Sequence, residues 1–268
     1  MHSKHLVSAS PSLQIAADGP IVDINWHYLM KTRAEVIQAN DSMPAYLLMP
    51  EITGLIDSEL NANRRMAFEM MWMLGCRVSE LLLLTPRHFV FNGQSSYVNM
   101  PTLKRRTPDQ TKRRRKRLND LDTLGNLPLR QIPITDVQFV ARLQSYMVTE
   151  RLPDNRRFFG ITRRTINRWV DEAVSNYEAQ YGPFQVHLSP HVFRHSYAVN
   201  AVLHFTPLKI LQGWLGHASQ ANTEIYTKVL FSDSFEFAKR IAWRPVIQAI
   251  DKTRIKQPEL FYTDISDS

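Results

Sequence analysis

The stretch HLSPHVFRHSYA, residues 187–198, decides how this chain folds around its reactive groups. Ser189 and Pro190 are typical of the first turn of a helix, so we predict that a helix begins here. His191 and Arg194 are three residues apart and therefore share one face of that helix. An imidazole and a guanidinium side by side are suited to hold the oxygens of a phosphate.

Three further segments carry chemically active side chains at defined spacings. They are MLGCRVSELLLL at 73–84, LQGWLGHAS at 211–219 and ANTEIYTKVL at 221–230. Arg77 lies among apolar residues of the first segment, where a guanidinium needs an anionic partner such as Glu80. His217 precedes Tyr226 by nine residues. Two arginines, two histidines and a tyrosine in this order can cut and rejoin a phosphodiester without a metal. The cations stabilise charge on the phosphate oxygens, and the tyrosine supplies a covalent nucleophile.

In this order and spacing the four segments resemble the tyrosine recombinases, also called the phage integrase family. The resemblance covers residues 46–240. GCRVSELLLL is similar to the family's first arginine box, HVFRH to its HxxRH box, and LGHAS with TEIYT to its third box. Phe193 stands where leucine is usual. A single box arises by chance, but four in order are specific. Size and basicity also resemble the plasmid-encoded multimer resolvases of the F-plasmid type.

The resemblance implies a catalytic set drawn from all four segments. Tyr226 would be the nucleophile that attacks the scissile phosphate and forms a 3′-phosphotyrosine link. Arg77 and Arg194 would clamp the phosphate. His217 would hydrogen-bond a non-bridging oxygen, and His191 would accept the proton of the tyrosine. Each residue alone has an ordinary interpretation, as a packed tyrosine, a surface arginine or an ordinary histidine, and only the set of spacings outweighs it.

The resemblance also implies an acid for the departing 5′-oxygen and residues that support the catalytic set. We assign the acid to Lys104, at the end of a predicted strand, with Lys112 and Lys116 as alternatives. An ordinary cluster of surface cations is the competing interpretation. Glu80 would hold the first arginine, and His195 would buttress the site.

A basic run at residues 104–117, KRRTPDQTKRRRKR, holds all the excess positive charge of the chain. The formal charge is +8; nine of the 33 Lys and Arg and one of the 25 acids lie in this run, so 24 of each remain elsewhere. Strand patterns flank the run at 95–105 and 130–135, where Arg130 and Pro133 resemble the family's second strand, so we predict a long hairpin. We expect the run to contact DNA phosphates rather than to form a merely solvated loop. The predicted DNA-binding residues are Arg105, Arg106, Lys112, Arg113, Arg114, Arg115, Lys116 and Arg117.

The apolar periodicity predicts a mainly α fold: a tyrosine-recombinase-like catalytic domain with a small β-hairpin or sheet and a short N-terminal helical arm. We place the arm, a reduced DNA-binding segment, at residues 1–45 and the catalytic domain at 46–268. Because the first region is short for the family, a reduced clamp or the basic run must help to hold the duplex. Helices are predicted at 21–40, 52–61, 62–77, 79–89, 137–152, 162–182, 191–205, 207–217, 222–230 and 232–243.

The composition argues against several other classes of protein. Cys76 is the sole cysteine, so a disulfide framework or a cysteine-based zinc site is excluded. No apolar stretch reaches the length of a membrane span, and the first residues lack the apolar region of a signal peptide. We expect a bacterial cytoplasmic enzyme that needs neither a cofactor nor a metal.

These observations predict a site-specific recombinase that acts on double-stranded DNA, as a tetramer, with accessory proteins as candidate partners. We favour the resolution of plasmid multimers, and inversion and integration are alternatives with the same chemistry. Two competing interpretations assign the chain to another functional class: a non-catalytic DNA-binding relative, or a type IB topoisomerase. The filled catalytic positions argue against the first, and the RVSELLLL and LGHAS boxes against the second. A metal-dependent relaxase would need a histidine cluster beside its tyrosine, and the sequence has none there.

Overall fold

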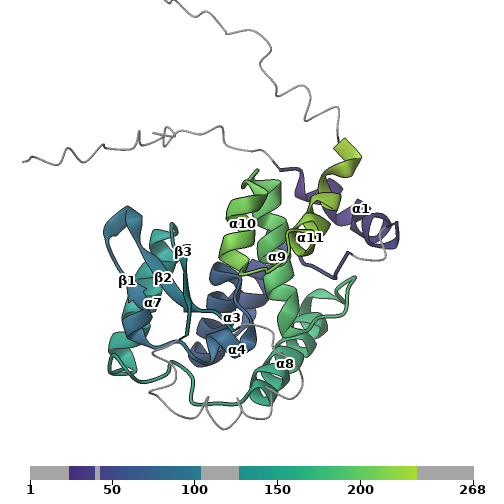
Figure 1. Ribbon diagram of the computed structural model, residues 1–268. Helices are drawn as coiled ribbons and strands as arrows, with labels where there is room; N and C mark the ends of the chain where they lie inside the picture. Colours follow the sequence, from purple (N-terminus) through teal and green to yellow (C-terminus); the bar gives the residue numbers. More distant parts are fainter. Residues whose placement is uncertain (1–23, 40–42, 104–126, 234–268) are drawn as a thin grey trace, which may run out of the picture. The chain divides into compact units, whose positions relative to one another are not determined.

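The computed structural model describes residues 24–39, 43–103 and 127–233 (Figure 1). The described residues up to 229 form one compact unit, and the described residues 230–233 belong to a second. The described part is mainly helical with one small sheet, which confirms the predicted fold class. The helices are α1 (Trp26–Gln38), α2 (Met49–Ser58), α3 (Ala62–Leu74), α4 (Val78–Leu81), α7 (Val137–Thr149), α8 (Arg163–Tyr181), α9 (Pro190–Leu203), α10 (Leu208–Leu215) and α11 (Ala221–Glu224). The strands are β1 (Phe89–Val90), β2 (Tyr97–Pro101) and β3 (Leu129–Pro133), and the 3₁₀ helices are η1 (Pro86–His88), η2 (Gly93–Ser95) and η3 (Ile225–Asp233).

Side-chain caps and prolines fix where the helices begin. Asn61 caps α3, Asp136 caps α7 and Thr162 caps α8, each by accepting a backbone N–H of the first turn. α9 begins at Pro190, where the sequence predicts it. Among the described helices, none combines the length and the apolar character needed to cross a lipid bilayer.

The sheet has the order β1-β2-β3 with both pairs antiparallel. β2 and β3 are the strands predicted on either side of the basic run, and their pairing places Val98 opposite Ile132, both fully buried. β1 was not predicted. The short buried helix predicted within 79–89, with Pro86 as its end, is present as α4 but already ends at Leu81. A turn and η1 follow it, and Pro86, which cannot donate a backbone hydrogen bond, begins η1.

α3 lies at the centre of the hydrophobic core. Apolar side chains occupy every face of this helix, and all residues from Met66 to Trp72 are buried, including Glu69. A helix that is apolar all round is stable only inside a packed core. α3 accordingly contacts α2, α4, α7 and α9, and Figure 1 shows it between α4 and α9. The rings of Phe68 and Phe193 stack with centroids 5.6 Å apart, so α3 and α9 are held face to face.

A buried ion pair fastens α1 to the rest of the compact unit. The Arg33 side chain is 1% exposed, and its guanidinium donates to both carboxylate oxygens of Glu51 at the start of α2. It also donates to the side chain of Gln185, 3.2 Å away, before α9. The predicted N-terminal helix is therefore present, and an ion pair holds it to the start of α2. The division into an arm and a catalytic domain at residues 45 and 46 stays a prediction.

Candidate active site

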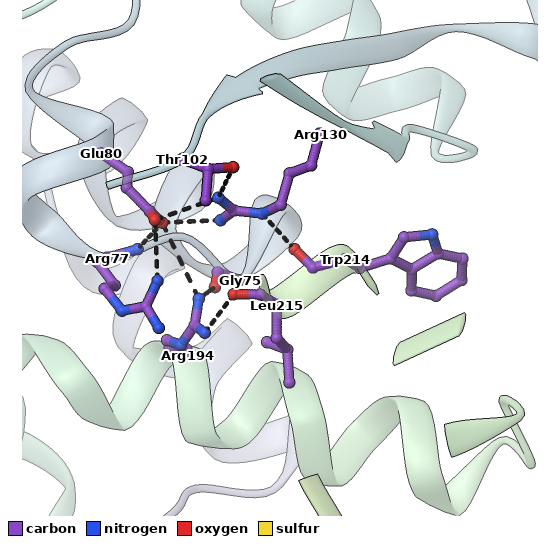
Figure 2. Close-up of polar contacts among 8 residues, drawn as sticks. All are labelled: Gly75, Arg77, Glu80, Thr102, Arg130, Arg194, Trp214 and Leu215. Atoms are coloured by element: carbon purple, nitrogen blue, oxygen red, sulfur yellow. Dashed lines mark hydrogen bonds and ion pairs between the residues drawn. The ribbon is translucent and has the colours of Figure 1, made fainter. Parts of the chain in front are cut away.

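Glu80 is the hub of the polar cluster drawn in Figure 2. It lies in the first turn of α4, where its carboxylate accepts the backbone N–H of Arg77 at 2.9 Å and the Nη1–H of the same residue at 2.9 Å. This is the geometry of a capping box, in which a glutamate at the third helical position reaches back to the residue that starts the helix. The spacing of Arg77 and Glu80 therefore fixes the arginine by local structure alone.

The Glu80 carboxylate is fully buried, and its charge is balanced by arginines. Burial by itself raises the pKa of the carboxyl. The hydrogen bonds and charges of Arg130 and Arg77 outweigh burial and hold the pKa below its ordinary value. Glu80 is thus a permanent anion that orients the cations around it.

Arg194 reaches the same hub from α9. Its Nη1–H donates to the carbonyl of Gly75 at 2.8 Å, its Nη2–H donates to the carbonyl of Leu215, and Nη1 lies 4.0 Å from Glu80. Both carbonyls belong to helix C-terminal ends, where a cation is favourable. Burial and the charge of Arg77 lower the pKa of Arg194 to about 10, so it stays protonated at neutral pH.

The two predicted clamps differ in exposure. The Arg77 side chain is 30% exposed and the Arg194 side chain 4%. Figure 2 shows their guanidinium groups next to one another below Glu80. Arg77 is therefore accessible to a ligand, whereas Arg194 is held from behind by the ends of two helices.

Tyr226 lies in η3 with its ring buried, 1% exposed, and its hydroxyl hydrogen-bonds Nδ1 of His195 at 2.8 Å. Burial raises the pKa of the phenol to about 12, an effect that the charges of Arg194 and Arg77 partly offset. Burial, with the neighbouring His191 and Arg194, lowers the pKa of His195 to about 4. At neutral pH the pair is a protonated phenol beside a neutral imidazole.

The histidine that contacts the tyrosine is thus His195, the predicted buttress, rather than His191, the predicted proton acceptor. His191 lies one turn earlier on α9, with its ring centroid 6.3 Å from that of His195. Its Nε2 is 3.4 Å from Nη2 of Arg163 at the start of α8. Burial and the charges of Arg163 and Arg194 lower the pKa of His191.

His217 lies just after α10, and its Nδ1 hydrogen-bonds the buried hydroxyl of Thr223 in α11 at 2.9 Å. This contact leaves Nε2 as the other ring nitrogen available to a ligand. Burial, then the charges of Arg194 and Arg77, lower the pKa of His217 to about 4. The structure therefore brings Arg77, His191, Arg194, His217 and Tyr226, which come from four separate segments, into one cluster linked by hydrogen bonds and electrostatic contacts.

The profile of the phage integrase family matches residues 48–233, more than two thirds of the chain. The chain belongs to this family, and it is a site-specific tyrosine recombinase. A resolvase from Escherichia coli is 33% identical over 215 residues, which cover 74% of this chain and 79% of that protein. A resolvase from Escherichia coli K12 is also 33% identical over 215 residues, covering 74% and 76%. The tyrosine recombinase XerC of Neisseria gonorrhoeae is 33% identical over 105 residues, covering 38% of this chain and 34% of that protein.

Solved tyrosine recombinase structures share the fold. The XerH site-specific recombinase in a pre-cleavage complex with its difH substrate superposes with a TM-score of 0.54 at 17% identity, over 69% of this chain and 51% of XerH. XerA recombinase gives a TM-score of 0.53 at 23% identity, over 75% of this chain and 66% of XerA. The chain thus spans about half of the XerH chain and about two thirds of XerA. At these identities the likeness establishes the fold alone.

The recombinase site contains two residues to which the sequence assigned no role in it. Arg130, noted only as a strand residue, donates to both oxygens of Glu80. Thr223 orients His217. A signal for Arg130 exists, because it shares one face of β3 with the buried Ile132, and an arginine on a buried face needs an anion. No comparable signal exists for Thr223, because its contact depends on how α10 and α11 meet.

Lys104 lies outside the described residues, as do its alternatives Lys112 and Lys116. The remaining predicted DNA-binding residues lie outside them too: Arg105, Arg106, Arg113, Arg114, Arg115 and Arg117. Within the described ranges, no group of three or more His, Cys, Asp or Glu side chains is placed to hold a metal ion.

Proposed function

We propose that this recombinase cuts and rejoins double-stranded DNA through a 3′-phosphotyrosine link on Tyr226. The observation that carries the proposal is the hydrogen bond between Tyr226 and His195. It lies close enough to Arg77 and Arg194, which both pair with the buried Glu80, for their charges to lower the pKa of the phenol. This arrangement would pair a nucleophile with a proton acceptor, and its fixed positive charge would stabilise the negative charge that develops on a phosphate.

The reaction follows from these groups. The phenolic oxygen of Tyr226 attacks the phosphorus, the bond to the 5′-oxygen breaks, and the phosphate becomes linked to the tyrosine. His195 takes the phenolic proton, and His191 is the alternative acceptor one turn earlier. Lys104 is our candidate for protonating the departing 5′-oxygen. Attack by the 5′-hydroxyl of a partner strand reverses the link, so the bond energy is conserved.

Arg77, Arg194 and His217 hold the phosphate oxygens during both steps. A guanidinium offers paired donors matched to two oxygens and keeps its charge throughout. The structure leaves Arg77 the more exposed of the two arginines, so it meets the phosphate directly, while Arg194 acts from the buried side. Neither step uses ATP or a metal in this scheme.

We further propose that the biological outcome is the resolution of plasmid multimers in the bacterial cytoplasm by a tetramer assembled on a specific DNA site. The similarity to two resolvases of Escherichia coli over about three quarters of each chain supports this outcome. The region at 1–45, anchored through α1, would help to hold the duplex as a reduced arm. Accessory proteins remain candidate partners.

Covalent trapping tests the chemistry. Purified protein is incubated with fragments tiling the DNA around its own gene, and duplexes nicked near the mapped site then serve as suicide substrates. We expect a protein–DNA adduct on a 3′-phosphate with wild type and none with Tyr226→Phe, which should still bind the DNA. Tyr181→Phe, which alters an exposed tyrosine, is the matched control and should form the adduct normally. An adduct retained by Tyr226→Phe would refute the assignment.

The same assay separates the two histidines. His195→Ala should slow adduct formation more than His191→Ala if the contact seen here is the one used in the reaction. If His191→Ala instead lowers the rate of adduct formation more than His195→Ala does, then His191 is the proton acceptor.

A plasmid dimer assay tests the outcome. With two mapped sites in direct repeat, the protein should convert a dimer to monomers, and crosslinking should show four protomers on two sites. Efficient inversion of inverted repeats with no resolution would point to an invertase. Relaxation of supercoils without exchange between sites would point to topoisomerase activity.

A further inference from the structure

Arg130 joins three separate parts of the chain. Its Nη1–H and Nη2–H donate to the two carboxylate oxygens of Glu80 at 3.1 and 2.8 Å, and Nη1–H also reaches the hydroxyl of Thr102 at 3.2 Å. Its Nε–H donates to the carbonyl of Trp214 at 2.7 Å. Figure 2 shows the guanidinium at the meeting point of α4, the end of β2 and the end of α10. With a side chain 9% exposed, it is part of the interior.

The end of α10 is shaped to admit Arg130. Gly216 closes α10 in the left-handed conformation, with φ 62°. A Cβ at this position would lie 3.2 Å from Cδ, Nε and Cζ of Arg130, closer than side chains normally pack. Glycine is therefore favoured here for two reasons, the positive φ and the close approach of the Arg130 side chain, which a Cβ would force to shift.

The last two carbonyls of α10 are each taken by a different arginine. Trp214 accepts from Arg130, and Leu215 accepts from Arg194. His217 follows two residues after Leu215, beyond Gly216. The same two cations that surround Glu80 therefore hold the end of α10, from which the chain leads to His217, while Gln212 and Thr223 bond His217 itself.

Arg130 also limits how strongly the Glu80 carboxylate attracts the two clamp arginines, Arg77 and Arg194. It occupies both carboxylate oxygens, whereas Arg194 stays 4.0 Å away. Among the contacts of the described residues, the Arg77 side chain uses only Nη1 on Glu80. Removal of Arg130 would leave a buried carboxylate facing the two clamps alone and would draw their donors away from a phosphate.

We propose that Arg130 is a positioning residue for strand cleavage: by bridging Glu80 and the end of α10, it holds Arg77, Arg194 and His217 in register with one another. The proposal rests on the proposed function, because it assumes that these three residues act on the scissile phosphate. Arg130 itself does not touch the DNA in this scheme.

Single-turnover cleavage of the nicked duplex at saturating protein tests the proposal, with the dissociation constant measured separately. Arg130→Lys keeps the charge but has three donors on one nitrogen, so it cannot make all four hydrogen bonds of the planar guanidinium, and Arg130→Ala makes none. A misplacement of catalytic groups by about 1 Å lowers a rate by roughly 100-fold, and we expect losses of this order with little change in DNA affinity. The rate is expressed per folded molecule, from a urea melt of each variant.

Arg142 provides the matched control. It also makes two hydrogen bonds to a buried glutamate, Glu69, but it lies on α7, away from the cluster around Glu80. Arg142→Ala should lower stability and leave the rate per folded molecule unchanged. Ethylguanidinium added to Arg130→Ala should restore part of the rate, whereas ethylammonium, which has the charge without the fork, should not.

Gly216→Ala tests the same packing contact between Arg130 and the end of α10 by changing the residue on α10. It should displace Arg130 and slow cleavage, and the double variant with Arg130→Lys should lose little more than either single variant. Gly93→Ala is its control, because Gly93 also has a positive φ, 52°, but open space where a Cβ would lie. Gly93→Ala should cleave at the wild-type rate.

The outcomes separate this proposal from the proposed function. If wild type forms the adduct, Tyr226→Phe does not, and Arg130→Lys and Arg130→Ala cleave at the wild-type rate, then the function stands and the positioning role is wrong. A rate loss that disappears once expressed per folded molecule, without rescue by ethylguanidinium, also overturns it, because Arg130 would then only stabilise the fold. If Tyr226→Phe still forms an adduct, the proposed function itself fails.

Discussion

Burial shifts the acid–base groups of the site away from their ordinary pKa values, each toward its neutral form. The pKa of Tyr226 rises to about 12, and those of His195 and His217 fall to about 4. At neutral pH the nucleophile keeps its proton, and both imidazoles are free to accept one. The positive charge that the reaction needs therefore comes from the arginines, which stay ionised throughout.

These shifts make the stability of the protein depend on pH. An unfolded histidine binds its proton near pH 6.5, but His195 and His217 resist protonation in the folded state down to about pH 4. Between these values the unfolded state binds more protons, so the free energy of unfolding falls as the pH is lowered through this window and is fully present above it. Allowing for solvent screening of partly exposed rings, each imidazole contributes on the order of 1–2 kcal/mol.

Urea melts at pH 7.5 and pH 5.0 measure this effect. Wild type should lose stability between the two, and the double variant His195→Asn, His217→Asn should lose clearly less. Some loss should remain in the variant, because His88 and His191 also have lowered pKa values. An equal loss in wild type and the double variant would contradict the assignment.

The elements that position the site follow largely from local sequence signals. The helix at Pro190 is predicted from its first turn, and α7 and α8 from their apolar spacing; all three are present. The contact between Arg77 and Glu80 is also local, because it is the capping geometry of α4. The pairing of β2 with β3 follows from the strand patterns on either side of the basic run.

The missed features depend on contacts between distant segments. Arg130 meets Trp214 across 84 positions of sequence, and His195 meets Tyr226 across 31. Periodicity places each residue on a face of its own element, but it does not state which element packs against that face. The segment 222–230, which contains Tyr226, is predicted from its spacing as one regular helix, whereas α11 ends at Glu224 and the chain continues as the 3₁₀ helix η3. The choice between His191 and His195 was beyond sequence reasoning, since both lie on α9 one turn apart.

Two groups of cationic residues in this chain have different roles, the arginines of the site and the basic run. Arginines of the site are bonded to one buried glutamate, Glu80, and to helix ends, and they are fixed before DNA binds. The basic run at 104–117 instead holds the entire excess of positive charge. Preorganised cations serve chemistry at one phosphate, and a dense run of cations serves affinity for many phosphates.

Salt dependence distinguishes these two roles. Each neutralised phosphate releases counterions, so replacing Arg113, Arg114, Arg115 and Arg117 together by Gln should reduce the slope of log affinity against log salt by up to roughly 0.9 for each phosphate that is no longer neutralised. Affinity for random and specific DNA should fall alike, because phosphate contacts carry no sequence information. Arg142→Gln, which removes an arginine paired with Glu69, should leave the slope unchanged. An unaltered slope in the quadruple variant would mean that the run does not contact DNA.

Lys104 belongs to the same run by sequence, yet its proposed role is chemical. If it protonates the departing 5′-oxygen, Lys104→Ala should retain DNA affinity and slow cleavage of the nicked duplex. A substrate with sulfur in place of the bridging 5′-oxygen should then restore the rate, because a thiolate leaves without a proton. The quadruple arginine variant should gain nothing from that substrate, since its defect lies in binding. If Lys104→Ala instead loses affinity in step with the arginine variant and is not rescued by sulfur, then Lys104 is one more phosphate-binding cation, and Lys112 or Lys116 becomes the candidate acid.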